Sequence, residues 1–417
     1  MDKKYVFLQP EYYSRFKCDG QKCGAHCCQG WNIPIDETTY NKYRKLKPKS
    51  EAKKVLAAVR FNENIGKHVI KFAENGKCPM LTSDCWCSLQ KKYGEEILSD
   101  ICRTYPRVIQ YLGSFIERSL TLTCPVAAEL IFGSDEPLSF EQIELGEKEA
   151  HRVFKLTTFA PDIPSEMLKH FFSVQYASIS ILQARNLSID GRLIVLGFFL
   201  DRLDELSSAG RFDEIEQLVA VYSSEEFLQS ESARLIADIE FDAVKYIRMM
   251  FNLLESIYGE GSEFNHSNRR YIDAIRDVLE IKVDENNGVS LSKIAANYQK
   301  LSSARSEFLK KNSIRLEHYL VNEFFLGVYP WKTPYPILQN YGIFVATYKI
   351  LELIALSLDV QWQRISNNTK EMPEEYQLLP TMMQCATNVD HNAKYLSCVL
   401  EHLEKDVLTI MQSLLDG

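Results

Sequence analysis

The residues best suited to chemistry in this sequence are the cysteines near its N-terminus. Nine of the eleven cysteines fall within the first 124 residues, where an even distribution would put about three. They follow the spacing C-x4-C-x3-C-C from Cys18 to Cys28 and C-x6-C-x-C from Cys78 to Cys87, and Cys102 and Cys124 stand alone. Such grouping indicates metal, disulfide or redox chemistry, because cysteines that only fill a core are not normally clustered along a chain.

Thiolates from separate segments can complete either a tetrahedral zinc site or an iron–sulfur cluster, since both take four soft sulfur ligands. The sequence lacks the C-x2-C pair that most zinc ribbons use, which weakens a simple zinc-finger interpretation. Cys78 and Cys124 each precede a proline, as the last cysteine of ferredoxin-type runs does. The pattern therefore favours an iron–sulfur cluster and leaves zinc as the alternative.

Composition and charge limit the classes of protein. The chain has 417 residues, 46% of them hydrophobic, and is long enough for two or three domains. A net charge of −8 argues against broad nucleic-acid binding, which depends on Lys and Arg. The first residues are too polar for a signal peptide, so we expect a cytoplasmic protein. In that reducing compartment metal ligation is favoured over disulfides.

The elements around the cysteines are expected to be short, with the thiols in loops and at element ends. Asp36 is predicted to cap a helix that reaches about residue 61 and breaks at Pro48. Gly20, Gly24 and Gly30 would let the backbone wrap closely around a bound group. The later elements are expected to be a hairpin of 68–72 with 78–81, a helix over 88–104, and a hairpin of 108–112 with 115–123.

A polar turn cluster at 133–140 is predicted to separate two domains, a cysteine-rich module over 1–132 and a helical domain over 139–417. The most apolar window, 343–358, contains Lys349 and Glu352, so we expect a buried helix there and no membrane span. The fold class is therefore predicted to be mainly α, with short β-hairpins confined to the N-terminal module. Candidate helices are 139–156, 164–186, 190–207, 211–222, 230–258, 267–282, 290–327, 336–361 and 391–415.

The sequence carries none of the common nucleotide-binding or hydrolase motifs, neither G-x-G-x-x-G after a strand nor a P-loop, H-E-x-x-H or G-x-S-x-G. Cys23 and Cys27 give C-x3-C, but the next cysteine is adjacent, so the C-x3-C-x2-C of ordinary radical-adenosylmethionine enzymes is not matched. The residues alone therefore predict a metal-cluster protein of undefined reaction. A non-catalytic metal-binding or redox-sensing protein that docks a partner through its helical body is the alternative to an enzyme.

Several N-terminal motifs resemble the bacterial flagellin lysine-N-methylase family. They are Pro10-Glu-Tyr-Tyr13, Cys18, Cys23, Cys27-Cys28, Gly30-Trp31, Ile35-Asp36, Cys78-Pro-Met-Leu81, Cys102-Arg-Thr-Tyr-Pro106 and Leu122-Thr-Cys124-Pro125. The first 125 residues are also similar to small zinc- or iron-chelating cysteine-cluster proteins. Asn322-Glu-Phe-Phe325 before Pro330-Trp331 is a softer match in the helical part.

The resemblance implies a protein-lysine N-methyltransferase that uses S-adenosylmethionine, acts on flagellin, and holds an iron–sulfur cluster, of the 4Fe-4S type, in its cysteine module. Arg103, Tyr105 and Arg107 are then candidates for binding the methionine carboxylate, because arginine binds carboxylates bidentately. A salt bridge from these residues to the helical body is the equal alternative. Asn322 and Glu323 are candidate pocket residues, although a packed helix end explains them as well.

The resemblance also guides the choice of metal ligands. Cys23, Cys27 and Cys28 with Cys87 or Cys102 form the favoured inner group, and Cys85 is the weakest candidate because Cys78 and Cys87 fit the shared pattern without it. Cys385 and Cys398 are expected to be ordinary helical cysteines. The full set of metal candidates is Cys18, Cys23, Cys27, Cys28, Cys78, Cys87, Cys102 and Cys124.

Overall fold

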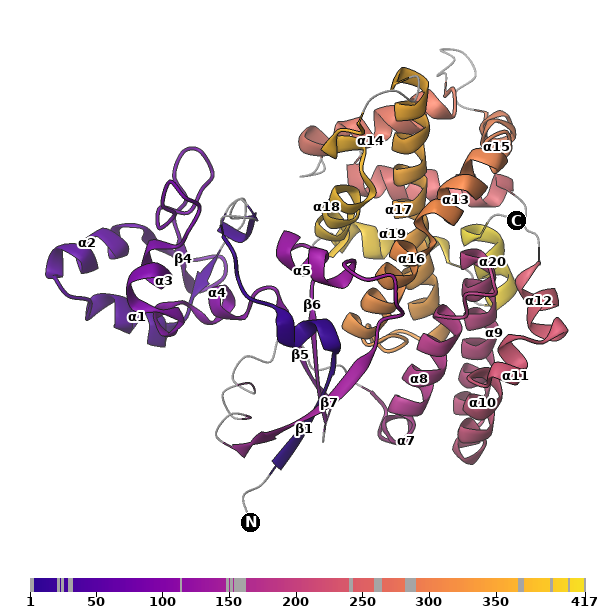
Figure 1. Ribbon diagram of the computed structural model, residues 1–417, viewed down its shortest axis with the longest axis horizontal. Helices are drawn as coiled ribbons and strands as arrows, with labels where there is room; N and C mark the ends of the chain where they lie inside the picture. Colours follow the sequence, from indigo (N-terminus) through magenta and orange to yellow (C-terminus); the bar gives the residue numbers. More distant parts are fainter. Residues whose placement is uncertain are drawn as a thin grey trace. The chain divides into compact units, whose positions relative to one another are not determined.

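The chain divides into two compact units, which are described separately. Unit 1 comprises Met1–Gly133 and Ser139–Ala160, and unit 2 comprises Ser134–Leu138 and Pro161–Gly417. Helices predominate, and the two sheets of the described residues lie in unit 1 (Figure 1), so the predicted mainly α fold class is confirmed. The computed structural model describes residues 4–20, 23, 26–28, 33–112, 115–147, 150, 153, 163–239, 243–258, 265–281, 290–366, 371–390, 393–403 and 406–415.

The larger sheet of unit 1 has the strand order β5-β6-β1-β7. Strand β1 runs parallel to β6 and antiparallel to β7, so the first strand of the chain lies inside the sheet. Phe7 of β1 is buried with Ile109 and Ile116, which gives the sheet an apolar core of its own. The elements are β1 (Lys4–Pro10), β5 (Arg107–Leu112), β6 (Phe115–Leu120), β7 (Phe140–Gly146), the 3-10 helix η1 (Glu11–Arg15) and helix α5 (Pro125–Ile131).

Two sequence predictions meet different outcomes in this sheet. The predicted second hairpin is confirmed, because β5 and β6 pair antiparallel from Arg107 to Leu120; its turn at 113–114 lies outside the described residues. The predicted helix over 139–156 is wrong over 140–146, which form strand β7. Half-buried residues alternate with exposed ones from Glu141 to Gly146, and this period of two belongs to a strand.

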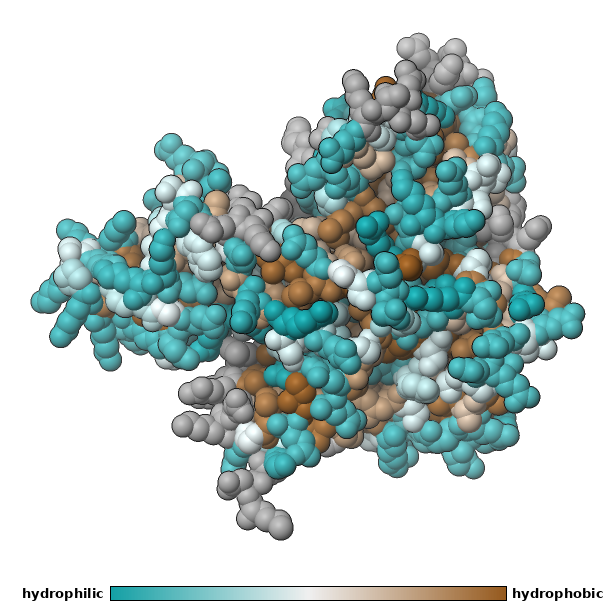
Figure 2. Space-filling view, viewed as in Figure 1, coloured by the Kyte–Doolittle hydropathy of each residue, from teal (hydrophilic) through white to brown (hydrophobic). Residues whose placement is uncertain are grey.

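The rest of unit 1 packs short helices on a small antiparallel sheet of order β2-β4-β3. Asp36 caps the first helix as predicted, since its Oδ1 accepts a hydrogen bond from the Thr39 backbone N–H at 2.8 Å. Hydrophilic side chains cover the outer side of helices α1 and α2 (Figure 2). The elements are β2 (Pro34–Ile35), α1 (Glu37–Arg44), α2 (Lys49–Ala57), β3 (Val59–Asn62), β4 (Lys67–Ile70), α3 (Ser88–Tyr93), η3 (Glu95–Ile97) and α4 (Asp100–Thr104).

Two predictions in this region are wrong in detail. Strand β4 pairs with β3 and β2 rather than with residues 78–81, although the chain does turn between the two segments, with Gly76 at φ +72°. The single helix expected over 88–104 is divided into α3, η3 and α4, because Gly94 ends α3 at φ +78°. Both differences leave Cys87 and Cys102 at the starts of short helices.

Unit 2 is built from helices over its described residues. The long helix α17 packs against α9, α14 and α16, and almost every residue of the apolar window 343–358 is buried in it, as predicted. None of the helices in the described ranges combines the length and the apolar character that a bilayer crossing requires. The helices are α7 (Ser165–Lys169), α8 (Phe171–Leu182), α9 (Ile189–Ser208), η4 (Phe212–Glu214), α10 (Ile215–Tyr222), α11 (Glu225–Leu228), α12 (Glu231–Ala237), α13 (Ala243–Tyr258), α14 (Asn265–Val278), α15 (Leu291–Gln299), α16 (Ser302–Leu326), α17 (Ile337–Ser366), η5 (Glu374–Tyr376), α18 (Leu378–Asp390), α19 (Ala393–His402) and α20 (Val407–Leu414).

Close packing between α9 and α17 gives a first testable prediction. A Cβ atom added at Gly197 would lie 2.7 Å from the Tyr341 ring and would also meet Met411. Met411 can turn away, but the Tyr341 hydroxyl donates to the Leu193 carbonyl at 2.9 Å, which holds the ring in place. We therefore expect Gly197→Ala to lower the free energy of unfolding by about 1–3 kcal/mol, measured in urea. Gly146→Ala, where a Cβ meets nothing within 4 Å, is the control, and an equal loss in both variants would contradict the packing argument.

Candidate metal centre

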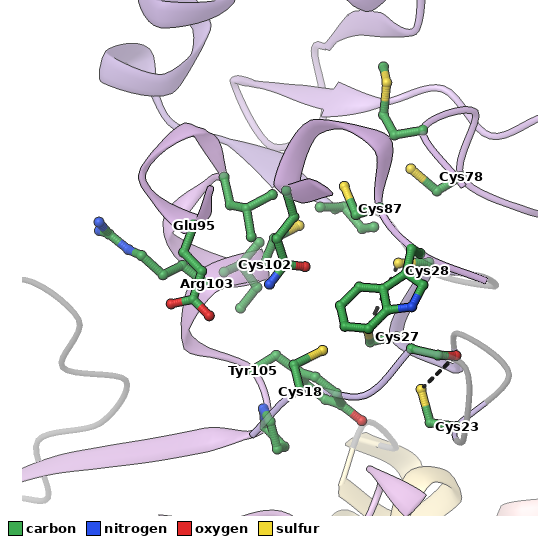
Figure 3. A pocket seen from close by; sticks show the side chains of 18 of the residues that line it. Cys18, Cys23, Cys27, Cys28, Cys78, Cys87, Glu95, Cys102, Arg103 and Tyr105 are labelled. Carbon is green, nitrogen blue, oxygen red and sulfur yellow. Dashed lines mark hydrogen bonds between the residues drawn. The ribbon is translucent and has the colours of Figure 1, made fainter. Parts of the chain in front are cut away.

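The cysteines of unit 1 surround one cavity of about 90 Å³. Its lining includes all eight cysteines proposed as ligands from the sequence, and it also includes Cys85, the candidate ranked lowest. In Figure 3, Cys27 and Cys28 lie between Cys78 and Cys87 on one side and Cys18 and Cys23 on the other. The nine lining cysteines are Cys18, Cys23, Cys27, Cys28, Cys78, Cys85, Cys87, Cys102 and Cys124.

A close backbone approach brings the first cysteine segment against the second. Gly20 lies against the Cys85 carbonyl, where any Cβ atom would clash with backbone rather than with a movable side chain. Cys85 itself has a positive φ of 60°, which turns the chain between Cys78 and Cys87. The Cys78 backbone N–H donates to the Cys28 carbonyl at 2.8 Å. Gly20 therefore allows the backbone to approach closely, as expected from the sequence, whereas Gly24 and Gly30 lie outside the described residues.

The remaining thiols come from the starts of short helices. Cys87 is the N-cap residue of α3, and Cys124 is the N-cap residue of α5, whose first position is Pro125. Cys102 lies in the first turn of α4. Its backbone N–H donates a hydrogen bond to the Oγ of Ser99, the N-cap residue of that helix, at 3.4 Å. Proline after Cys124 thus has a local structural cause, since proline suits the first turn of a helix and has no N–H to leave unpaired.

The surroundings of the cavity disfavour thiolates. Desolvation raises the pKa of Cys18 and Cys102 to about 12, and that of Cys78 and Cys124 to about 11, with repulsion from neighbouring cysteines adding to the effect. The sulfur atoms of Cys27 and Cys28 are 3.9 Å apart, and the hydrogen bond between them lowers the pKa of Cys27 and raises that of Cys28. A soft metal cation would compensate the negative charge of the thiolates, which the buried surroundings alone do not stabilise. Its binding would release the thiol protons.

The donor set fits a cysteine-bound metal group in its chemistry, with thiols from four separate segments on one cavity. As they stand, no three Cys, His, Asp or Glu side chains among the described residues are placed to hold a single metal ion. A tetrahedral zinc site needs four ligands around one point, at about 2.3 Å for sulfur, whereas a cluster distributes its thiolates over several iron atoms. Zinc and an iron–sulfur cluster therefore both stay predictions for this cavity.

The three residues predicted to bind the methionine carboxylate also line this cavity. Arg103 donates through Nη2 to Asp100 at 2.6 Å and through Nη1 to Glu96 at 3.5 Å, so its ion pairs lie within unit 1. The Tyr105 hydroxyl donates to Thr123 Oγ1 at 3.0 Å. The Arg107 guanidinium lies 4.9 Å from the centre of the Phe16 ring. Their role in cofactor binding stays a prediction.

Other candidates from the sequence lie elsewhere. Asn322 and Glu323 belong to α16 of unit 2, where Asn322 is buried. Cys385 and Cys398 lie in helices α18 and α19, as expected of ordinary helical cysteines. Trp31 lies outside the described residues. The contact between Gly20 and the Cys85 carbonyl could not be predicted, because the pairing of a glycine with a distant turn leaves no signal in a single sequence.

Comparison with known proteins links this chain to one family. The sequence model of the FliB lysine N-methylase C-terminal domain matches residues 175–415. The lysine-N-methylase of Salmonella typhimurium is 29% identical over 143 residues, which are 34% of this chain and 36% of that protein. The flagellar biosynthetic protein FliU of Salmonella muenchen is 29% identical over 151 residues, which are 36% of this chain and 86% of that protein.

The matched stretch thus spans little more than a third of the length of the Salmonella typhimurium enzyme. No solved structure gives a significant match to the chain. The domain match is the stronger finding, because it extends over more than half of the chain and covers nearly all of unit 2 after α7. On that basis, the chain belongs to the FliB lysine N-methylase family.

Proposed function

We propose that this chain is a protein-lysine N-methyltransferase that transfers methyl groups from S-adenosylmethionine to lysine side chains of flagellin, in the cytoplasm before export. The observation that carries the proposal is the lysine N-methylase domain match over residues 175–415. Flagellin as the substrate is supported by the flagellar biosynthetic protein among the relatives. A methylase requires a methyl donor, and S-adenosylmethionine is the donor that the sequence resemblance implies.

The transfer step defines what the protein must provide. The neutral ε-amine of the substrate lysine attacks the sulfonium methyl carbon, the C–S bond breaks, and its electron pair stays on sulfur, which leaves S-adenosylhomocysteine. The methylated ammonium then gives its extra proton to water or to a carboxylate. The amine must therefore be deprotonated and held in line with the methyl group, and a desolvated site favours both.

We further propose that the methyltransferase depends on an iron–sulfur cluster held by the cysteines of unit 1. Cys23, Cys27 and Cys28 with Cys87 or Cys102 would be the ligands, and Cys18, Cys78 and Cys124 line the same cavity. When bound, such a cluster would supply redox-active iron and a strong local charge. The close approach of Gly20 to the Cys85 carbonyl brings the two cysteine segments against each other and supports this proposal.

A labelling experiment tests the proposed function. Anaerobically purified protein, tritiated S-adenosylmethionine and flagellin should give label on flagellin lysines under reducing conditions, with mass spectrometry locating each added methyl group. Flagellin without the protein is the control for background. Absence of label on lysine, from a preparation whose iron content is stoichiometric, would overturn the proposal in favour of a non-catalytic cysteine-cluster protein.

A further inference from the structure

A second cavity, of about 980 Å³, lies within unit 2. It is roughly ten times the volume of the cysteine cavity and falls in the range of sites that enclose small-molecule cofactors, about 300–1,000 Å³. Its walls come from the segment leading into α9, from α9, from the end of α12 and the start of α13, and from α15 and α16. The charged side chains that line it are Arg185, Asp190, Arg192, Asp238, Arg305, Lys310 and Glu317.

Arg192 is the buried cation of this cavity, with 3% of its surface exposed. Its Nε donates to the Leu187 carbonyl at 3.1 Å, and its Nη1 donates to the Leu182 carbonyl at 3.0 Å and to Glu317 at 2.9 Å. Its Nη2 donates to no group in the described part of the chain. A buried guanidinium that is fixed on one edge thus keeps donors available for an anionic group in the cavity.

The cavity also presents charges of both signs that the fold has not paired. Lys310 on α16 and Asp238 at the end of α12 are exposed, line the cavity, and have no ion-pair partner among the described residues. In contrast, Asp190 is held by Arg305 and Lys349. The free pair of opposite charges suits a zwitterion better than a simple anion or cation.

One face of α16 adds hydroxyl groups and an apolar surface. Ser302, Ser306 and Ser313 line the cavity together with Leu309, and their spacing of four, three and four residues places them on one side of the helix. Ile194 of α9 is a further apolar lining residue. Hydroxyl groups can form hydrogen bonds with the hydroxyls of a ribose, and apolar side chains can pack against a flat base.

We propose that this cavity in unit 2 is the binding site for the methyl donor, an amino acid zwitterion joined to a nucleoside. Arg192 and Lys310 bind its carboxylate, Asp238 binds its ammonium group, and the serines of α16 bind its ribose. The assignment rests on the proposed methyltransferase function, which requires such a donor. The cysteine cavity of about 90 Å³ is too small for a nucleoside, and ion pairs with Asp100 and Glu96 already occupy Arg103 there.

Binding of S-adenosylhomocysteine, measured by calorimetry on the full iron-loaded chain, tests the assignment without requiring turnover. Ser306→Trp fills the cavity from an exposed helix position and should weaken binding at least tenfold. Ser303→Trp is the matched control, because Ser303 is also exposed on α16 but does not line the cavity. Its affinity should stay within twofold of the unmodified protein. Asp238→Asn together with Lys310→Ala should also weaken binding, without filling the space.

Two results would overturn the site. One is no binding of S-adenosylhomocysteine by the unmodified protein, and the other is unchanged affinity in Ser306→Trp. Loss of binding in Arg107→Ala with retention in Ser306→Trp would move the donor to the cysteine cavity and would likewise reject the assignment. If Ser306→Trp removes binding but flagellin lysines gain no label from the unmodified protein, the donor site stands and the proposed function alone fails.

Discussion

Cys27→Ser is expected to abolish iron binding, whereas Cys398→Ser is expected to leave the iron content unchanged. Cys27 lies among the cysteines that line the cavity of unit 1, with its sulfur 3.9 Å from that of Cys28. Serine is similar to cysteine in shape and slightly smaller, but it replaces the soft sulfur ligand with an oxygen that binds iron poorly. Iron per chain, from elemental analysis of anaerobically purified protein, and visible absorption are the measurements.

The loss of iron should also abolish most of the methyl-transfer activity. Loss of an outer hydrogen-bond partner of a metal ligand costs about 10–100-fold in affinity or activity, so loss of the ligand itself should cost at least about 100-fold in methyl transfer. Cys398 is a suitable control, because its thiol is half-buried in α19 and donates to the Asn252 carbonyl at 3.5 Å, in the other unit of the chain. Equal iron in Cys27→Ser, Cys398→Ser and the unmodified protein would remove Cys27 from the ligand set.

The gathering of the cysteines could be predicted because it depends on composition and local spacing. Nine thiols within 124 residues indicate a shared cause wherever the strands and helices lie. The predicted gathering therefore does not depend on the bounds of the secondary-structure elements. The division of the helix expected over 88–104 illustrates this, since Gly94 ends α3 and yet Cys87 and Cys102 still line one cavity. The larger cavity of unit 2 had no such signal, because its lining comes from three stretches, 185–194, 237–243 and 298–317, that lie far apart in sequence.

Strand β7 shows why part of the fold could not be predicted from the sequence. Residues 140–146 carry three glutamate or glutamine side chains and fit a polar helix about as well as an edge strand. The strand conformation of β7 is stabilised by β1, which lies at least 130 residues earlier in the chain. Residues Lys4 to Pro10 of β1 pair with β7, and Phe7 is buried in the core of the sheet. Long-range pairing of this kind overrides local propensity. In unit 2 helix α18 was not predicted, and the helix expected over 230–258 is represented by α12 and α13.

Glu317→Gln is expected to lower the free energy of unfolding by about 3–5 kcal/mol, the largest stability loss that we predict for a single change. The Glu317 side chain is 1% exposed and accepts hydrogen bonds from Arg185 and Arg192, with Oε1 2.8 Å from Arg185 Nη2 and Oε2 2.9 Å from Arg192 Nη1. A neutral amide would leave the buried guanidinium of Arg192 without its counter-charge. Burial already lowers the pKa of Arg192, against the stabilising effect of Glu317.

An ion pair at the surface serves as a control that distinguishes the effect of burial from the effect of charge pairing. Glu205 pairs with Arg202 at 2.5 Å on α9, but both side chains are about half exposed. Water and salt screen such a pair, so Glu205→Gln should cost at most about 1 kcal/mol in the same urea unfolding experiment. A loss as small as that of Glu205→Gln would contradict the prediction, because it would show that the buried guanidinium of Arg192 does not depend on the Glu317 carboxylate for its counter-charge.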